Sequence, residues 1–186
     1  MKNTLEKAGI FLGEDALCRL EQYLALLIAW NKQMDLTSVP DEEMKERHFA
    51  DSLLPLTKEG LFPQNASLID VGTGAGFPGL VMAAAREDLQ VTLLEAQQKR
   101  CTFLQAVCDA LQLKNVTLIH DRAETLGKNN AHREQYDRAV ARAVAPMNVL
   151  CEYLLPFVKV GGRMACYKGP SAAEEIEAGS KAARMM

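Results

Sequence analysis

The sequence predicts an α/β fold in which a mainly parallel sheet follows a helical cap. From Ser67 onward, short apolar segments alternate with helical ones, and this order produces right-handed crossovers and a sheet covered by helices on both faces. Before that point, apolar residues between Leu17 and Ile28 recur at helical spacing and form one stripe. We therefore expect a helical cap over residues 1–62 and the α/β domain over residues 63–186.

The individual elements follow from local signals. A second cap helix is expected over 41–58, because Ser38 and Pro40 precede a first turn rich in acidic residues. Short apolar runs predict the strands, which are expected at 67–71, 90–95, 115–120, 136–141 and 162–168. The helices between them are expected at 78–86, 97–111 and 147–158.

The segment "IDVGTGAGFPG" (69–79) fits two different nucleotide-binding patterns. Gly74-x-Gly76-x-x-Gly79, between a strand and a helix, is the dinucleotide fingerprint. The run Asp70-x-Gly72-x-Gly74-x-Gly76 is the pattern of methyltransferases that use S-adenosylmethionine. Both patterns need a tight turn and a close approach of the ligand to the backbone. The glycines alone therefore leave both readings open.

Three further features favour the methyltransferase. Asp70 would repel a pyrophosphate but could accept the amino group of a methionine moiety. The acidic turn "HDRAE" (120–124) follows the third strand, where contacts to adenine are expected. "LLPFVKVGG" (154–162) ends in the Gly-Gly turn that commonly precedes the last core strand of that group. Glu95 would bind ribose hydroxyls in either reading, so an NAD(P)-dependent oxidoreductase stays as the alternative.

The residues near the fourth strand restrict the methyl acceptor. "ARAVA" (141–145) lacks the [Asp/Asn]-Pro-Pro-aromatic tetrad of enzymes that methylate amino groups of bases, and no cysteine lies where a thiolate nucleophile would be needed. Guanine N7 needs neither, because its lone pair is available without removal of a proton. We expect Arg122, Arg142 and Lys168 to serve catalysis there, with any base-contacting arginine on guanine O6 and the others on phosphates.

Composition limits the partners. A net charge of −3 gives no global attraction to nucleic acid, so RNA binding must come from a local patch. Five cysteines without a C-x-x-C pair predict reduced thiols in the cytoplasm and no metal site. The sequence shows neither a signal peptide nor a membrane span, so no membrane partner is expected. It specifies no oligomeric state.

Several segments together resemble the RsmG (GidB) family of 16S ribosomal RNA guanine-N7 methyltransferases. They are "WNKQMDLTS" (30–38), "RHFADSL" (47–53), "DVGTGAGFPG" (70–79), "LLEAQQKR" (93–100), "RAE" (122–124), "ARAVA" (141–145) and "YKG" (167–169). The resemblance implies a class I, Rossmann-like sheet in the order 3-2-1-4-5. It also implies S-adenosylmethionine as cofactor and 16S ribosomal RNA or the small ribosomal subunit as partner.

The resemblance also implies roles for individual residues. The cofactor site would comprise the glycine loop and its surroundings: Asp70, Gly72, Gly74, Gly76, Phe77, Glu95, Ala123, Glu124 and Arg142. Arg122, Arg142 and Lys168 would face the RNA. Five residues of the cap would close over the site on the substrate side: Asn31, Arg47, His48, Asp51 and Ser52. His48, Asp51 and Ser52 contain the letters of a hydrolase triad, but their spacing within one helix favours ordinary hydrogen bonding.

Two departures from the family pattern are present. Asp35 stands where the family usually has asparagine, which adds a negative charge near the expected RNA face. The sequence also ends at Met186, before the two strands that usually complete this sheet, so we expect a shortened sheet whose fifth strand is an exposed edge unless another chain covers it. A non-enzymatic alternative is a truncated RNA-binding or assembly protein that keeps the cofactor pocket.

Overall fold

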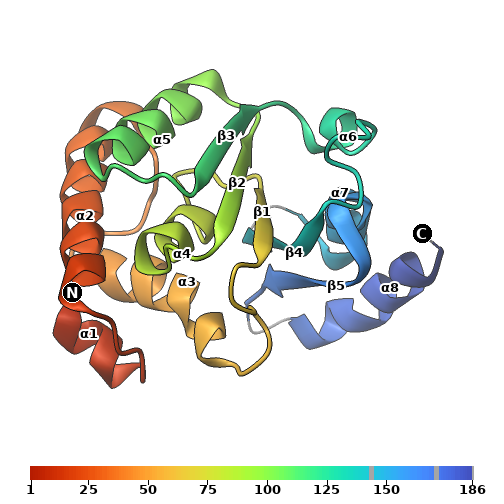
Figure 1. Ribbon diagram of the computed structural model, residues 1–186, viewed down its shortest axis with the longest axis horizontal. Coiled ribbons are helices and arrows are strands. Elements are labelled where there is room, and N and C mark those ends of the chain that lie inside the picture. The colour runs from red at the N-terminus through yellow and green to blue at the C-terminus, as the bar shows by residue number, and fades with distance from the viewer. Residues whose placement is uncertain (143–144, 170–171, 186) are drawn as a thin grey trace.

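The sheet contains five parallel strands in the order β3-β2-β1-β4-β5 (Figure 1). The computed structural model describes residues 1–142, 145–169 and 172–185. The strands are β1 (Ser67–Val71), β2 (Gln90–Glu95), β3 (Val116–His120), β4 (Tyr136–Arg142) and β5 (Val158–Tyr167). The predicted α/β class and strand order are confirmed. Strands β2 and β3 are added on one side of β1, and β4 and β5 on the other, so the strand order reverses between β1 and β4. A ligand crevice is expected at the carboxyl ends of the strands at such a point.

Helices cover both faces of this sheet (Figure 1). Along the chain they are α1 (Lys2–Lys7), α2 (Glu14–Met34), α3 (Asp51–Leu53), α4 (Gly79–Ala85), α5 (Gln98–Ala110), α6 (Ala123–Leu126), α7 (Met147–Leu154) and α8 (Ala172–Met185). Shorter helical turns are the π-helical η1 (Lys45–Ala50) and the 3₁₀ turns η2 (Leu54–Thr57) and η3 (Leu155–Phe157). The α2 helix packs on α4 and α5, whereas α6, α7 and α8 lie on the other side of the sheet.

Two hydrophobic clusters correspond to the two faces. Successive side chains of a strand point to opposite sides. Accordingly, Leu68 belongs to the larger cluster with α2, α4 and α5, and its neighbour Ile69 belongs to the smaller one with α7. The same alternation separates Leu93 from Leu94 in β2. Because the larger cluster also contains the buried cap residue Phe49, the cap and the sheet share one core.

The second cap helix differs from the prediction. Instead of one helix over 41–58, a turn precedes the π-helical η1, and the short α3 and η2 follow it. Pro55 explains the change at the end, because it has no N–H to donate and its ring clashes with the preceding turn of an α-helix. The π-helical turn brings the backbone carbonyl of Arg47 to a side chain of the sheet, as described below; such turns often occur at functional sites.

The fifth strand begins earlier than predicted. β5 starts at Val158 rather than at residue 162, and the pairing register with β4 shifts between Tyr136 and Arg138. Gly161, with a φ of +82°, provides the left-handed backbone that such an irregularity needs. A Gly-Gly pair therefore lies inside this strand as a bulge, although the sequence pattern indicated a turn before it.

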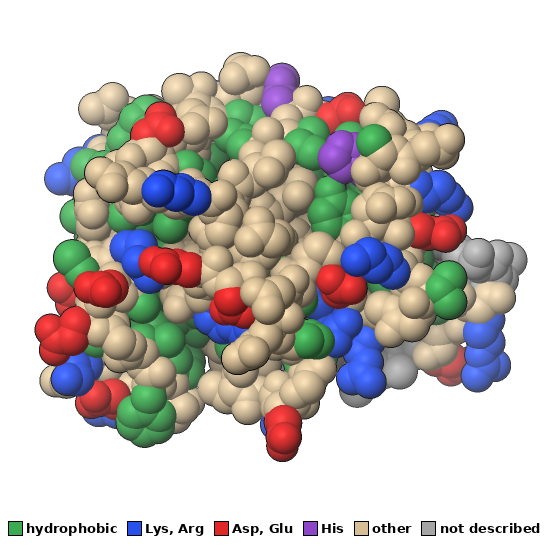
Figure 2. All heavy atoms as spheres, in the orientation of Figure 1, with side chains coloured by type: hydrophobic (Ala, Val, Ile, Leu, Met, Phe, Trp, Pro, Cys, Tyr) green, Lys and Arg blue, Asp and Glu red, His purple; other side chains and the backbone are tan. Residues whose placement is uncertain are grey.

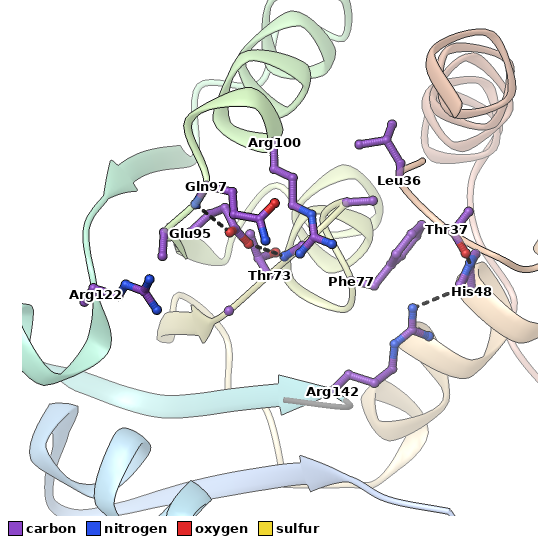
Figure 3. Close-up of a pocket in the computed structure, with 14 residues that line it drawn as sticks. Leu36, Thr37, His48, Thr73, Phe77, Glu95, Gln97, Arg100, Arg122 and Arg142 are labelled. Carbon is purple, nitrogen blue, oxygen red and sulfur yellow. Dashed lines mark hydrogen bonds between the residues drawn. The ribbon is translucent and has the colours of Figure 1, made fainter. Parts of the chain in front are cut away.

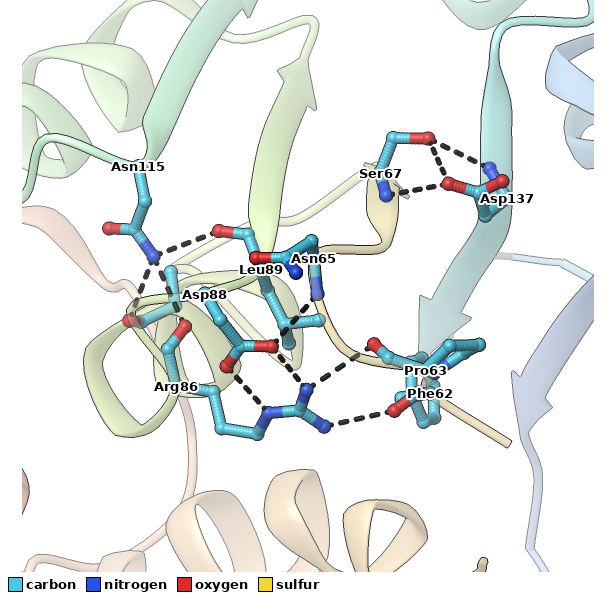
Figure 4. Close-up of polar contacts among 10 residues, drawn as sticks. Phe62, Pro63, Asn65, Ser67, Arg86, Asp88, Leu89, Asn115 and Asp137 are labelled. Carbon is cyan, nitrogen blue, oxygen red and sulfur yellow. Dashed lines mark hydrogen bonds and ion pairs between the residues drawn. The ribbon is translucent and has the colours of Figure 1, made fainter. Parts of the chain in front are cut away.

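A polar network at the amino ends of the strands holds the segment that joins the cap to β1 (Figure 4). Arg86 donates hydrogen bonds to the carbonyls of Phe62 (3.0 Å) and Pro63 (3.3 Å) and pairs with Asp88. On the neighbouring strand β4, the Arg138 guanidinium donates to the carbonyls of Leu61 and Gly60. These contacts tie the joining segment to two separate elements of the α/β domain.

The molecular surface carries interspersed charges. On the face drawn in Figure 2, Lys and Arg side chains alternate with Asp and Glu side chains rather than forming one basic area. Within the described residues, no helix has both the length and the apolar character that crossing a membrane requires.

Candidate functional site

A cavity of about 560 Å³ lies at the carboxyl ends of β1, β2 and β4 (Figure 3). The glycine loop after β1 forms its floor, the turn after β2 forms one wall, and residues of the cap cover it from above. The residues that line it are Leu36, Thr37, His48, Gly72, Thr73, Gly74, Ala75, Phe77, Glu95, Ala96, Gln97, Arg100, Arg122 and Arg142. The position is the one expected for a ligand crevice in an open parallel sheet.

The four glycines of the loop divide into two pairs. Gly72 and Gly74 line the cavity with φ values of +70° and +63°, and a Cβ built on Gly74 has no described neighbour nearer than 3.8 Å. A Cβ on Gly76 would instead overlap with Tyr23 Oη and reach Leu80 Cβ at 2.9 Å. A Cβ on Gly79 would lie 2.6 Å from Asp70 Cβ. The first pair leaves room for a ligand, whereas the second pair allows close packing.

Asp70 lies beneath the loop and is fully buried. Its Oδ2 accepts hydrogen bonds from Thr73 Oγ1 (2.6 Å) and from the backbone N–H of Gly79 (2.7 Å). Burial raises the pKa of this carboxyl from 3.8 to about 6, although both hydrogen bonds favour its charged form. In this structure Asp70 shapes the loop from below, and its direct contact with a cofactor stays a prediction.

Glu95, at the end of β2, joins the glycine loop to the turn after β2. Its Oε2 accepts the N–H of Gly74 at 2.9 Å, and its Oε1 accepts the N–H of Gln97 at 2.8 Å. The side chain is almost completely buried yet lines the cavity. A carboxylate oxygen can accept more than one hydrogen bond. Glu95 is therefore fixed in orientation and can still accept hydroxyl groups of a ribose.

Arg142, at the end of β4, contacts the cap directly. Its guanidinium donates to the Arg47 carbonyl (3.0 Å) and to Asp51 Oδ2 (2.9 Å), and it lies 4.8 Å above the centre of the Phe77 ring. The Arg142 side chain is 14% exposed. The predicted substrate-side residues of the cap and the predicted arginine of the sheet thus meet in one cluster over the glycine loop.

His48 connects this cluster to the preceding cap loop. Arg142 donates to His48 Nδ1 at 2.9 Å, so Nδ1 is the acceptor and the Nε2–H faces Thr37 Oγ1 at 2.7 Å. The ring stacks on Phe77 with a centroid distance of 4.3 Å. Burial and the adjacent Arg142 lower the pKa of His48 to about 4, so the ring is neutral at physiological pH. With both ring nitrogens directed elsewhere, His48 forms no hydrolase-type relay with Ser52.

The remaining predicted site residues lie in three places. Arg122, Ala123 and Glu124, at the start of α6, line a cavity of about 120 Å³ that adjoins the main one. Asn31 accepts the N–H of Thr37 and donates to its carbonyl, which shapes the cap loop. The hydroxyl of Ser52 is buried and has no partner among the described residues.

The side chain of Lys168 is mostly buried rather than exposed to solvent. Its ammonium lies 2.7 Å from Glu175 of α8 and donates to the Ala145 carbonyl at 2.9 Å. Glu175 in turn accepts the N–H of Met147 at the start of α7. The roles predicted for Lys168 stay predictions, and in this structure the side chain joins β5 to the start of α7.

The cavity is also lined by Thr37, Gln97 and Arg100, which were not predicted as site residues from the sequence. Gln97 and Arg100 follow the predicted ribose-binding Glu95 by a few residues, and that proximity was a usable signal. Thr37 had no such signal, because its hydrogen bond to His48 depends on how two separate cap segments fold together.

Comparison with solved structures shows that the same fold occurs in other proteins. A protein of Agrobacterium tumefaciens described as a predicted O-methyltransferase superposes with a TM-score of 0.56 at 20% identity, over 69% of this chain and 65% of that one. An S-adenosylmethionine-dependent methyltransferase of Aquifex aeolicus gives a TM-score of 0.51 at 21% identity, over 68% of this chain and 72% of that one. At these identities the similarity shows the fold.

Comparison of sequences shows the family. The family described as rRNA small subunit methyltransferase G, or GidB, matches residues 16–186. "Ribosomal RNA small subunit methyltransferase G" of Leuconostoc citreum is 47% identical over 97% of this chain and 76% of that protein. The protein of the same name from Alkaliphilus metalliredigens is 44% identical over 95% of this chain and 74% of that protein. This chain therefore belongs to the rRNA small subunit methyltransferase G (GidB) family.

Proposed function

We propose that this chain transfers the methyl group of S-adenosylmethionine to N7 of a guanine in the 16S RNA of the small ribosomal subunit. S-adenosylmethionine, when bound, supplies an electrophilic methyl group on a sulfonium sulfur. The name that the related proteins carry supports ribosomal RNA as the substrate class. One observation carries the choice of N7: no described residue that lines the cavity is available as a general base.

The two side chains lining the cavity that could act as a base, His48 and Glu95, are already engaged. His48 accepts from Arg142 and stays neutral because of its low pKa, and its Nε2–H points to Thr37. The two oxygens of Glu95 accept backbone N–H groups, and their remaining acceptor positions would be taken by the ribose hydroxyls of a bound cofactor. Asp70 is buried below the loop and does not line the cavity. Guanine N7 carries a free lone pair, so methylation there requires only alignment with the methyl group and exclusion of water. An acceptor amine would require a base that this arrangement does not offer.

The residues present fit the cofactor. Gly72 and Gly74 leave a bare, left-handed backbone facing the cavity, and Glu95 is oriented for two ribose hydroxyls. Ala123 and Glu124, in the adjoining small cavity, would hold the adenine end. The cap residues above the loop then serve to exclude water from the reacting atoms.

The RNA would contact the rim of the cavity. Arg122 lines the cavity and is exposed there, so it can reach phosphates or the guanine O6, as the local-patch prediction requires. Arg47 is exposed on the neighbouring turn of the cap, where its guanidinium pairs with Glu43. Arg142 would act chiefly by holding the cap over the acceptor. We propose that the acceptor is presented within the small subunit, in the cytoplasm, where five free cysteines would stay reduced.

The test incubates 16S RNA, or small subunits that lack the modification, with the protein and methyl-labelled cofactor, and then maps chemical cleavage at N7-methylguanine. We expect one labelled guanine with the wild-type chain and none with Arg142→Ala. Lys114→Ala is the control, because this exposed lysine lies at the opposite end of the sheet. RNA binding without transfer would support the assembly-protein alternative, and binding of NADH instead of S-adenosylmethionine would support an oxidoreductase.

A further inference from the structure

The main cavity holds an excess of positive charge. Three arginines line it, namely Arg100, Arg122 and Arg142, but only one carboxylate does, that of Glu95. S-adenosylmethionine itself carries a sulfonium, an ammonium and a single carboxylate, so its net charge is positive. A cavity of this composition would repel that cofactor unless the arginines are directed at specific anions.

The three arginines differ in how they are neutralised. Arg142 forms an ion pair with Asp51 and donates to two further acceptors of the cap. None of the ion pairs or side-chain hydrogen bonds found among the described residues includes the guanidinium of Arg100 or Arg122. Two guanidinium groups at this site therefore have no anionic partner among the described residues.

Arg100 and Arg122 lie at different depths. Arg122 is exposed, precedes α6 and borders the small cavity beside Ala123, on the rim that faces solvent. Arg100 is half-buried in the first turns of α5 and reaches over the glycine loop, between Gln97 and Phe77 (Figure 3). Its guanidinium nitrogen is the atom nearest to a Cβ built on Gly74, at 3.8 Å.

The position above Gly74 identifies the anion. The ribose is expected at Glu95, and Gly74 is joined to Glu95 by a hydrogen bond, so a ligand that follows the loop from Glu95 reaches Arg100 beside Gly74. Adenine and ribose carry no anionic group in this cofactor. The carboxylate of the methionine portion is the one anion that the ligand brings to the interior of the cavity, whereas RNA phosphates approach from the rim beside Arg122.

We infer that Arg100 binds the carboxylate of the methionine portion of S-adenosylmethionine, through a charge-assisted hydrogen bond over Gly74. This inference rests on the proposed function, because it concerns the same cofactor. It assigns a selective role to Arg100: a ligand without the carboxylate loses an attraction and leaves a guanidinium without its anion.

The experiment compares two ligands on matched variants by isothermal titration calorimetry. S-adenosylmethionine and decarboxylated S-adenosylmethionine are titrated into the wild-type chain, Arg100→Gln, Arg100→Lys and the control Lys99→Gln. Lys99 is an exposed neighbour on the same helix and does not line the cavity. Thermal unfolding without ligand establishes that every variant is folded.

We expect Arg100→Gln to weaken S-adenosylmethionine about tenfold to a hundredfold, as for loss of a charge-assisted hydrogen bond, and Arg100→Lys to weaken it less. The decarboxylated ligand should bind Arg100→Gln at least as tightly as it binds the wild-type chain, because the substitution removes a repelling cation, and Lys99→Gln should match the wild type for both ligands. Equal weakening of both ligands by Arg100→Gln would overturn the inference. So would unchanged cofactor affinity together with weaker binding of 16S RNA, which would assign Arg100 to a phosphate. A wild-type chain that binds no S-adenosylmethionine would instead refute the proposed function.

Discussion

Gly76 and Gly74, one from each pair of loop glycines, should respond differently to replacement by alanine. Gly76 has a φ of +98°, and its added Cβ would overlap with Tyr23 Oη and press on Leu80. Tyr23 cannot move aside easily, because it is fully buried and its hydroxyl donates to the Ala75 carbonyl. Gly74 also has a left-handed backbone, but its Cβ would point into the open cavity.

The magnitudes follow from these contacts. Left-handed backbone costs a residue with a Cβ about 1–2 kcal/mol. At Gly76 overpacking adds about 1–3 kcal/mol, and loss of the Tyr23 hydrogen bond adds about 1 kcal/mol. We expect Gly76→Ala to lower the free energy of unfolding by about 3–6 kcal/mol, a large part of the ~5–15 kcal/mol of a typical domain. Gly74→Ala should lower it by only about 1–2 kcal/mol.

Urea unfolding, followed by circular dichroism, and cofactor titration measure both consequences. With an m-value of about 2 kcal/mol/M, Gly76→Ala should shift the urea midpoint down by about 2 M and Gly74→Ala by less than about 1 M. Gly74→Ala should nevertheless lose most of its affinity for S-adenosylmethionine, because the methyl group occupies the ligand's space. Equal midpoints for the two variants, or a wild-type midpoint for Gly76→Ala, would refute this division of the loop.

Three further predictions concern folding and pH. Asn115→Ala should destabilise the chain by about 1–3 kcal/mol in a thermal melt, because the buried amide donates to three backbone carbonyls (Figure 4); a loss below about 0.5 kcal/mol would contradict this. The folded state lowers the pKa of His48 from 6.5 to about 4, so the unfolded chain binds the extra proton between these values and stability should fall by about 2–3 kcal/mol as pH drops through that window. His48→Gln should show a flatter pH profile there, and an unchanged slope would exclude His48 as the cause. Asp51→Asn should cost less than about 1 kcal/mol in urea, because the carboxylate that pairs with Arg142 is half exposed; a larger loss would show that the pair is better shielded than its exposure indicates.

The strands near the site were predictable because each is short, apolar and buried on both faces. β1 and β2 coincide with their predictions to the residue. The errors occurred where a local signal was ambiguous: Pro55 ends the α-helical geometry within the cap, and Gly161 lies inside a strand rather than before it. The short helix α6 was missed altogether, because four residues show no helical period.

The candidate site was predictable in its glycine loop and in Glu95, whose positions follow from the order of strand, turn and helix. The cluster around Arg142 was not. The sequence identified His48 and Arg142 separately, but their hydrogen bond joins residues 94 positions apart and depends on how the cap docks. Likewise, nothing local reveals that Asp70 is buried under the loop, where its Oδ2 accepts from Thr73 and from the N–H of Gly79.

The contact between Tyr23 and Ala75 has a consequence for the order of events during synthesis. It joins residues 52 positions apart, and the Arg142–Arg47 contact joins residues 95 positions apart. The glycine loop therefore cannot take its final shape from its own sequence, and its roof is incomplete until β4 has been made. A nascent chain that has exposed only the cap and the first βα unit should be unable to hold the methyl donor. Ligand-binding competence should then arise in one late step, once residues up to Arg142 are available, rather than growing gradually with length.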